Sequence, residues 1–495
     1  MIKAEREPDL GVKHSGFPYQ AEALAATKEL TYAAIFHEQG LGKTKIGIDL
    51  ALWWLQSNVV DSVIIVTKRA LIHNWIEELS FHTHVQPRLI TQDRKANFLA
   101  FNSPARIYLA HFEVMKSEEA RLKIFLQTRN VGMILDEAHK IKNPDAAVTR
   151  ALFHLIPLLK RRVIMTGTPV ANRPYDLWSQ IFFLDEGKSL GTDFEDFQTR
   201  LDLTNDLASD STKVREFEQN LASVFAKIRP FSVRETKKGA DIQLPQKNYQ
   251  TLCVDMEARQ SEIYQQYKRE FSSILLRDGQ PVLDDAEESL KRLLRLVQVA
   301  SNPRLIDDSY KAVPGKLPVL QQLVDEIIDR GEKVIVWTSF IANVDWLARE
   351  FRTYGAVRIH GKMGIDQRNS SVRSFKNDQD CKVLVATPAS AKEGLTLTVA
   401  NNAIFFDRGF SLDDYLQAQD RIHRISQTKE CTVTIMQARG TIDEWVDSLL
   451  SAKSLAAQLA QGDITREKYQ QNAEYSFGTM IKDVLGLDRK ESHGI

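Results

Sequence analysis

The sequence predicts an α/β protein with two tandem parallel-sheet lobes, helical insertions and a helical C-terminal tail. Three observations support this prediction. Short, almost continuous apolar runs alternate with helix-like patterns, as in parallel sheets covered on both faces. This alternation stops near the middle of the chain and then resumes. Hydrophobic residues make up 43% and charged residues 26% of the 495 residues, which is ordinary for globular domains.

The first lobe is predicted from five apolar runs of strand length. They are Ala33–Phe36, Ser62–Thr67, Ile107–Ala110, Val131–Leu135 and Arg162–Thr166. Between them lie segments such as Ala70–Leu79, where apolar residues recur at spacings of three and four. From about Pro174 to Leu244 the strand signals vanish and charged, helix-compatible sequence follows, as it also does in Met256–Val299.

The second lobe is predicted to begin near Lys316, just after the turn dipeptide Pro314-Gly315. Its strands are Lys333–Thr338, Val357–His360, Cys381–Ala386, Asn402–Phe406 and Thr432–Ile435. After Thr441, apolar residues fall on one helix face. We therefore expect lobe one at 1–230 with a helical insertion at about 174–230, a linker with a second helical insertion at 231–315, lobe two at 316–450 and the tail at 451–495.

Charge and cysteine usage exclude several classes of protein. Lys plus Arg and Asp plus Glu both total 65, so a binder with an overall basic charge is excluded and any cationic surface must be local. The three cysteines are far apart, which argues against a disulfide framework or a zinc site. No apolar run has bilayer length and the first residues do not resemble a signal peptide, so we expect a soluble protein without membrane contact.

A glycine-rich segment, His37–Thr44, follows the first predicted strand and opens a helix. That is the context of a phosphate-binding loop. The backbone of Gly40, Leu41 and Gly42 would face the phosphates, Lys43 would reach the β- and γ-phosphates, and the Thr44 hydroxyl would ligate Mg²⁺. His37 departs from the general pattern, which has glycine there. The alternative reading is a chance glycine turn before a helix.

Two acidic residues, Asp136 and Glu137, close the predicted strand Val131–Leu135. A carboxylate at the carboxyl end of a parallel strand lies beside the loops of its neighbours. Asp136 is therefore a candidate for holding Mg²⁺, and Glu137 for orienting and deprotonating an attacking water. An isolated acidic pair is more often a solvated turn, but its position after a buried strand favours the functional interpretation.

The run Leu135–Asn143 resembles motif II of Swi/Snf-type superfamily-two helicase-like ATPases, a DEAH box. Other motifs of that family follow in order over about residues 15–460. The segments that resemble them are Phe17–Gln20, Glu38–Thr44, Ile64–Leu79, Met165–Pro169, Leu244–Lys247, Val336–Phe340, Val383–Thr387, Glu393–Thr398 and Gln417–Gln427. Each motif alone is weak, whereas the ordered set is specific. The resemblance implies two RecA-like lobes that bind ATP and Mg²⁺ between them.

The resemblance also assigns roles to residues. It implies catalysis by Lys43, Asp136, Glu137, Arg421 and Arg424; ATP binding by Gln20, Gly40, Leu41, Gly42, Lys43, Thr44 and Gly394; metal binding by Thr44 and Asp136; coupling by Thr166, Gly167, Thr168 and Gln417; and DNA contacts by Lys68, Arg69, Ser339, Thr387 and Lys392. Arg421 and Arg424, spaced i, i+3, could instead be a solvated helix face. Each DNA candidate could be an ordinary surface residue.

The expected function is that of an ATP-dependent translocase on duplex or forked DNA, without sequence preference, which remodels, anneals or displaces proteins. One alternative is a strand-separating helicase on DNA or RNA. Another is a nucleotide-gated DNA-binding scaffold without turnover. The chain departs from the family pattern at Arg234-Glu235, at Ala391–Glu393, at Arg408–Ser411 and at Ser426. Its compact length favours a bacterial or phage source and the cytoplasm of a bacterium or infected host, or the nucleus in a eukaryote.

Overall fold

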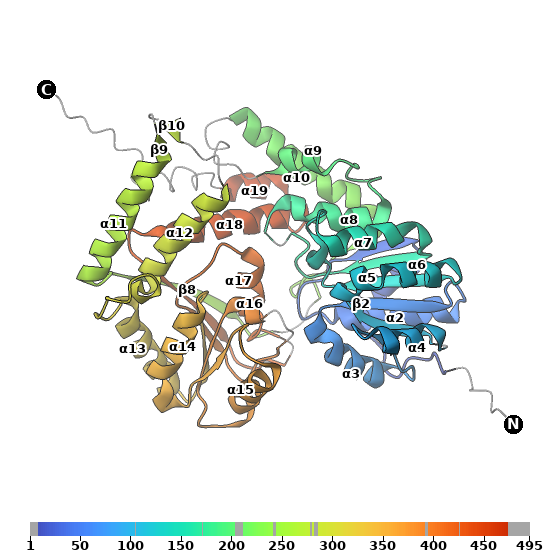
Figure 1. Cartoon of the computed structure of the whole chain (residues 1–495), viewed down its shortest axis with the longest axis horizontal. Coiled ribbons are helices and arrows are strands. Elements are labelled where there is room, and N and C mark those ends of the chain that lie inside the picture. The colour runs from blue at the N-terminus through green and yellow to red at the C-terminus, as the bar shows by residue number, and fades with distance from the viewer. Residues whose placement is uncertain are drawn as a thin grey trace. The chain divides into compact units, whose positions relative to one another are not determined.

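The computed structural model describes residues 8–103, 105–170, 172–202, 211–240, 244–277, 280–281, 286–391, 395–424 and 426–473. Its contacts divide the chain into two compact units. The first comprises Met1–Leu203, Arg215–Ile242 and Ala456–Gln471, and the second comprises Thr204–Val214, Gln243–Leu455 and Asn472–Ile495. Figure 1 shows a sheet flanked by helices in each unit. This architecture confirms the predicted fold class.

The sheet of the first unit has seven parallel strands in the order β3-β4-β2-β5-β6-β1-β7. The strands are β1 (Tyr32–Ile35), β2 (Ser62–Thr67), β3 (Arg88–Ile90), β4 (Ile107–His111), β5 (Val131–Asp136), β6 (Arg161–Met165) and β7 (Ser232–Val233). The central strands β2, β4 and β5 are buried along their whole length, which explains their unbroken apolar sequence. The short edge strands β3 and β7 lack that pattern, and sequence periodicity did not predict them.

Helices cover the first sheet and bury its apolar faces. They are α1 (Pro18–Thr27), α2 (Lys43–Gln56), α3 (Ile72–His82), α4 (Arg94–Asn102), α5 (Phe112–Ser117), α6 (Glu119–Gln127), α7 (Ala147–Leu155), α8 (Trp178–Asp185), α9 (Phe194–Leu201) and α10 (Ser211–Ile228). The core includes two fully buried tryptophans, Trp54 on α2 and Trp75 on α3. Helix α2 begins within the phosphate-loop segment, and α3 follows the next strand, β2.

The sheet of the second unit has six parallel strands in the order β12-β13-β11-β14-β15-β8. The strands are β8 (Lys247–Val254), β11 (Val334–Trp337), β12 (Val357–Ile359), β13 (Val383–Ala386), β14 (Asn402–Phe405) and β15 (Cys431–Ala438). The edge strand β8 comes from the segment expected to be a linker. Its burial pattern is mostly exposed or intermediate, so it carries no apolar signal in the sequence.

The helices of the second unit are α11 (Ala258–Leu275), α12 (Ala286–Ser301), α13 (Lys316–Asp329), α14 (Ile341–Glu350), α15 (Ile365–Asn377), α16 (Pro388–Ala391), α17 (Leu412–Gln419) and α18 (Ile442–Ala460). A two-strand hairpin, β9 (Leu276–Arg277) with β10 (Gln280–Pro281), lies between α11 and α12. Among the described residues, no helix is long and apolar enough to cross a membrane.

The C-terminal segment returns to the first unit. Helix α18 begins in the second unit, whereas Ala456–Gln471, which includes most of α19 (Arg466–Asn472), groups with the first. Figure 1 shows α19 beside α10, and Arg466 and Gln470 both contact the buried Glu218 of α10. Asp463 pairs with both Nε and Nη2 of Arg234, at 2.5 Å each. The tail therefore docks through specific polar contacts.

Gly462 makes this docking possible, because it ends α18 with φ +75° and faces the ring of Phe225 on α10. A Cβ at this position would lie 2.5 Å from Cζ of Phe225. Gly191 of the same unit has a similar φ of +87°, but a Cβ there would meet nothing within 4 Å.

We expect Gly462→Ala to undock the segment, whereas Gly191→Ala pays only the cost of left-handed backbone, about 1–2 kcal/mol. Limited proteolysis between α18 and α19, together with urea unfolding, measures the difference. Equal protease resistance of the two variants would show that the close approach of Gly462 to Phe225 is unimportant.

Candidate functional site

The phosphate-loop segment joins β1 to α2 with the backbone that such a loop needs. Gly40 and Gly42 have φ of +88° and +65°, and Gly42 is the residue before the first turn of α2. The ammonium of Lys43 donates to the carbonyl oxygens of His37 and Glu38, at 2.9 and 3.3 Å. Desolvation lowers the pKa of Lys43, and the negative charges of Glu137 and Asp136 partly offset this effect. Lys43 thus closes the loop and faces the acidic pair.

Gln20 contacts the same loop from α1. Its Nε2 donates to the carbonyl oxygens of Leu41 and Gly42, at 3.2 and 3.4 Å, while its Oε1 accepts from the backbone N–H of Phe17. A Cβ on Gly42 would lie 2.4 Å from this amide nitrogen. Glycine is therefore required here both by its φ and by the packing of Gln20.

Asp136 ends β5 and is held by the last residue of β2 and by helix α3. Its Oδ2 accepts from Thr67 Oγ1 at 2.9 Å and from Trp75 Nε1 at 2.8 Å. Burial raises the pKa of Asp136, as does the adjacent Glu137, and both hydrogen bonds lower it. Among the described residues its Oδ1 accepts no hydrogen bond, so this oxygen is suited to a metal ion or a metal-bound water. Thr44, on the first turn of α2, supplies a hydroxyl of the kind that Mg²⁺ accepts.

Glu137 has φ +57°, an uncommon value for a residue other than glycine. Its buried Oε2 lies 3.2 Å from Nδ1 of His139. Burial pushes the pKa of Glu137 upward, but the positive charges of Lys68 and Lys43, together with the contact to His139, outweigh it and hold the pKa below its usual value. A buried carboxylate on so uncommon a backbone conformation typically serves a function.

The segment Thr166–Thr168 follows β6 and packs on the phosphate loop. A Cβ on Gly167 would lie 3.0 Å from the backbone nitrogen of Gln39 and 3.1 Å from Nζ of Lys43, so glycine permits a close approach here. Thr166 Oγ1 lies 3.3 Å from Nδ1 of His139 and also accepts from the backbone N–H of Thr168. The predicted coupling segment therefore touches both the loop and the acidic motif.

The two cations predicted to contact DNA differ in environment. Arg69 is exposed, whereas Lys68 is half-buried and its Nζ lies 2.9 Å from Nε2 of His139. Lys68 therefore belongs structurally to the acidic motif, which spacing in the sequence did not indicate.

In the second unit, the predicted arginines contact the segment that follows Gly394. Arg421 is buried and donates from Nη1 to the carbonyl oxygen of Leu395 at 3.2 Å. Arg424 donates from Nη1 to Thr396 Oγ1 at 2.7 Å. Gln417, fully buried on α17, donates to Asp413. These contacts exclude the alternative that Arg421 is a solvated helix residue. Gly394 and Lys392 lie outside the described residues.

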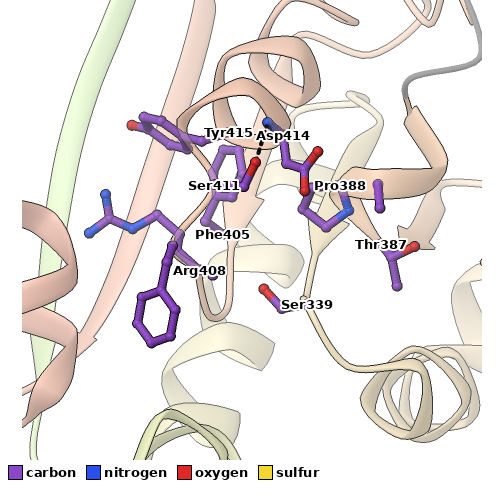
Figure 2. A pocket seen from close by; sticks show the side chains of 11 residues that line it. Ser339, Thr387, Pro388, Phe405, Arg408, Ser411, Asp414 and Tyr415 are labelled. Atoms are coloured by element: carbon purple, nitrogen blue, oxygen red, sulfur yellow. Dashed lines mark hydrogen bonds between the residues drawn. The ribbon is translucent and has the colours of Figure 1, made fainter. Parts of the chain in front are cut away.

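Ser339 and Thr387 follow β11 and β13 and line one hollow of about 190 Å³ at the carboxyl edge of the sheet. Arg408 and Ser411 line it too. Figure 2 shows the guanidinium of Arg408 turned away from Ser339 and Thr387, in keeping with its 2.7 Å ion pair to Asp447. The hollow thus brings together the two hydroxyl-bearing candidates for DNA contact.

Comparison with known families agrees with this geometry. The model of the SNF2-related domain matches residues 23–305, more than half of the chain, and the helicase conserved C-terminal domain matches residues 315–426. The chain belongs to the SNF2-related family.

Individual SNF2 relatives are similar over most of this chain. The Arabidopsis thaliana ATP-dependent DNA helicase DDM1 is 24% identical over 92% of the chain and 62% of its own length. The Saccharomyces cerevisiae ISWI chromatin-remodeling complex ATPase ISW1 is 24% identical over 92% of the chain and 41% of its own length. The Sulfolobus solfataricus SWI2/SNF2 ATPase core in complex with dsDNA is 25% identical with a TM-score of 0.42, covering 94% of this chain and 98% of that one. The chain spans less than two thirds of these curated relatives.

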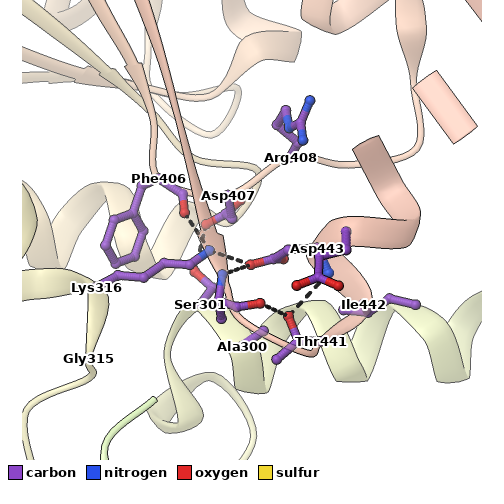
Figure 3. A network of polar contacts seen from close by, with 12 residues as sticks. Ala300, Ser301, Gly315, Lys316, Phe406, Asp407, Arg408, Thr441, Ile442 and Asp443 are labelled. Carbon is purple, nitrogen blue, oxygen red and sulfur yellow. Dashed lines mark hydrogen bonds and ion pairs between the residues drawn. The ribbon is translucent and has the colours of Figure 1, made fainter. Parts of the chain in front are cut away.

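A buried polar network contacts Ser339, one of the residues that line the 190 Å³ hollow of this SNF2 chain. Asp407 accepts from Thr338 Oγ1, from the backbone N–H of Ser339 and from Ser301 Oγ, at 2.6–2.7 Å. Figure 3 shows Lys316 beside it, directed at the Phe406 carbonyl and at Asp443, 2.9 and 2.6 Å away. This network holds the backbone of Ser339 through its N–H, and no periodic pattern in the sequence predicts it.

Sequence reasoning also missed two cations beside the phosphate loop. Lys237 is 8% exposed, and its Cε lies 3.6 Å from the position that a Cβ on Gly40 would occupy. Arg234 donates from Nη1 to the carbonyl oxygen of Phe36 at 2.5 Å. Both residues follow β7, whose two residues pair with β1, and a strand this short has no recognisable pattern.

His37, which replaces the first glycine of the general loop pattern, is 2% exposed, and neither ring nitrogen makes a hydrogen bond within the described ranges. Burial, together with the charge of Lys43, lowers its pKa from 6.5 to about 4. The folded state therefore binds a proton on His37 less readily than the unfolded state. Its contribution to stability is complete above pH 6.5 and is lost as the pH falls from 6.5 toward 4.

When the pH falls from 7 to 5, we expect the titration of His37 to lower the free energy of unfolding by about 2 kcal/mol. In His37→Phe this part of the pH dependence should disappear, whereas His73→Phe, at an exposed imidazole, should keep it. Urea unfolding at several pH values measures the difference. An unchanged slope in His37→Phe would mean that other groups cause the acid sensitivity.

Proposed function

We propose that the chain is an ATP-dependent DNA translocase of the SNF2 type, which couples ATP hydrolysis to movement on duplex or forked DNA. One observation carries the proposal. Lys43 of the phosphate loop, the carboxylates of Asp136 and Glu137, and the Thr166–Thr168 segment meet at the carboxyl edge of one parallel sheet. This arrangement supplies a phosphate cradle, a metal-binding carboxylate and a base within one site.

In this proposal the backbone of Gly40–Gly42 and the ammonium of Lys43 bind the phosphates of ATP, and Gln20 keeps the loop in shape. Thr44 and Asp136 hold Mg²⁺, which neutralises phosphate charge when bound. Glu137 accepts a proton from the attacking water. Its position next to Asp136, with the ammonium of Lys43 close by, supports this role.

Arg421 and Arg424 are the cations that would stabilise the charge of the transferring phosphoryl group, a role for which guanidinium groups are suited. Their contacts with Leu395 and Thr396 link them to the segment after Gly394. Neither unit alone carries both this pair and the phosphate loop. Hydrolysis therefore requires both units, and the ATP cycle can move one unit relative to the other.

DNA as the substrate is supported by the relatives, among which DDM1 is named an ATP-dependent DNA helicase and ISW1 a chromatin-remodeling complex ATPase. Arg69, Lys68, Ser339 and Thr387 are the described candidates for contacts to the phosphate backbone. Since the net charge is zero, binding depends on such local groups and should be sequence-independent and weaken with salt.

We expect wild-type protein to hydrolyse ATP faster with duplex or forked DNA than with single-stranded DNA or RNA. Lys43→Ala and Glu137→Gln should each reduce turnover at least about 100-fold, because they remove a phosphate contact and the general base. DNA affinity should be kept, since neither side chain is placed at the DNA.

Steady-state phosphate release and DNA binding by fluorescence anisotropy test this prediction, with Lys95→Ala, an exposed lysine of α4, as the matched control. Undiminished turnover in Lys43→Ala would refute the site. Stimulation by single strands or RNA alone would replace the translocase with a strand-tracking helicase. No turnover by the wild type on any nucleic acid would favour a scaffold.

A further inference from the structure

Lys68, which directly follows β2, occupies an unexpected position for a residue that the sequence predicts to contact DNA. Its side chain is half-buried and its Nζ lies 2.9 Å from Nε2 of His139, in the acidic motif. An ammonium group can only donate a hydrogen bond, so Nε2 is the acceptor and the ring proton resides on Nδ1. Lys68 therefore selects the tautomer of His139.

The protonated Nδ1 of His139 faces both parts of the hydrolytic machinery. It lies 3.3 Å from Thr166 Oγ1 and 3.2 Å from Oε2 of Glu137. His139 is only 6% exposed, so contacts within the protein, rather than solvent, set the orientation of its ring. A continuous chain of contacts thus runs from Lys68 through His139 to Glu137 and Thr166.

Lys68 also stands where nucleic acid can compete for it. Arg69, next in the chain, is exposed, and so is Lys140, next to His139. Two exposed cations thus neighbour, in sequence, the two residues of the Lys68–His139 contact. A backbone phosphate bound there would offer Lys68 a charged acceptor in place of the neutral ring nitrogen, and charge-assisted hydrogen bonds are roughly twice as strong as neutral ones.

We propose that Lys68 is a positioning residue that couples DNA to ATP hydrolysis. In the resting protein it fixes His139, which holds Glu137 turned toward the ring. A phosphate of bound DNA draws the ammonium of Lys68 away, and Glu137 becomes free to engage the attacking water. DNA stimulation would then arise from the loss of one hydrogen bond. This inference rests on the proposed ATPase function and adds a route by which DNA controls it.

The test compares ATP turnover without DNA and with saturating duplex DNA in the wild type, Lys68→Ala and Lys68→Met. Lys123→Ala is the control, because Lys123 donates a 2.7 Å hydrogen bond to Glu119 on α6, away from the site. In both Lys68 variants we expect the DNA-free rate to rise. The ratio of stimulated to basal rate should fall at least about fivefold, the lower end of energetic couplings between sites. Lys123→Ala should behave as the wild type.

Two other outcomes would overturn the proposal. In the first, only the half-saturating DNA concentration rises, and the slope of log affinity against log salt falls by about one. Lys68 would then be an ordinary phosphate contact. If basal and stimulated rates fall together, its role is merely structural. Combining Lys68→Ala with His139→Ala gives a further check. The two changes should be non-additive in the stimulation ratio because they break the same chain of contacts.

A measurement that needs no turnover separates this proposal from the ATPase assignment. In nucleotide-free protein with ¹⁵N-labelled histidine, duplex DNA should shift the Nε2 resonance of His139, identified from its loss in His139→Ala. The shift should be absent in Lys68→Met. An unmoved resonance at saturating duplex would refute the competition for Lys68, even in an active enzyme. If the resonance shifts in a protein that hydrolyses no ATP, DNA does act on the Lys68–His139 contact, and only the proposed function is refuted.

Discussion

The ammonium of Lys43 is the group around which the first unit is organised. It lies in a desolvated loop, held by the carbonyl oxygens of His37 and Glu38, with Glu137 and Asp136 as its nearest balancing charges. The surroundings of Lys43 come from the carboxyl ends of four strands. The loop follows β1, the two carboxylates lie at the end of β5, Thr67 ends β2 and Gly167 follows β6. Only parallel strands bring their carboxyl ends to one edge, so the sheet topology is a requirement of the site.

Because these strand ends lie close together, side chains have little space there, and two positions require glycine. Gly42 gives space to the amide of Gln20, and Gly167 approaches Gln39 and Lys43 closely. Trp75 packs in the core and at the same time donates to Asp136, so the helix that covers the sheet also orients the carboxylate that we propose as a metal ligand. Stability and chemistry share the same side chains here, and a core substitution at Trp75 would affect both.

In the second unit, a buried polar network orders the loop that follows β11. Asp407 orders the backbone after β11, and Lys316 ties α13 to the end of β14 and to the start of α18. Buried charges are tolerated only when paired and hydrogen-bonded, as these are. The same helix α18 continues into the segment that docks on the first unit through Asp463 and Arg234. Arg234 in turn contacts the carbonyl oxygen of Phe36, directly before the phosphate loop, so Asp463 is linked to that loop through one arginine.

The sequence by itself determined the features that depend on local pattern. Apolar runs predicted the central strands, because a strand buried on both faces must be apolar throughout. The ordered motifs predicted the family and the loop of Lys43, since phosphate binding requires glycine at fixed spacing before a helix. The edge strands β3, β7 and β8 were not predicted, because exposed or very short strands carry little periodicity. Only the tertiary structure placed Lys68 against His139, Lys237 and Arg234 against the phosphate loop, and Ala456–Gln471 on the first unit. These contacts join residues distant in sequence, and no local pattern records which long side chain reaches which neighbour.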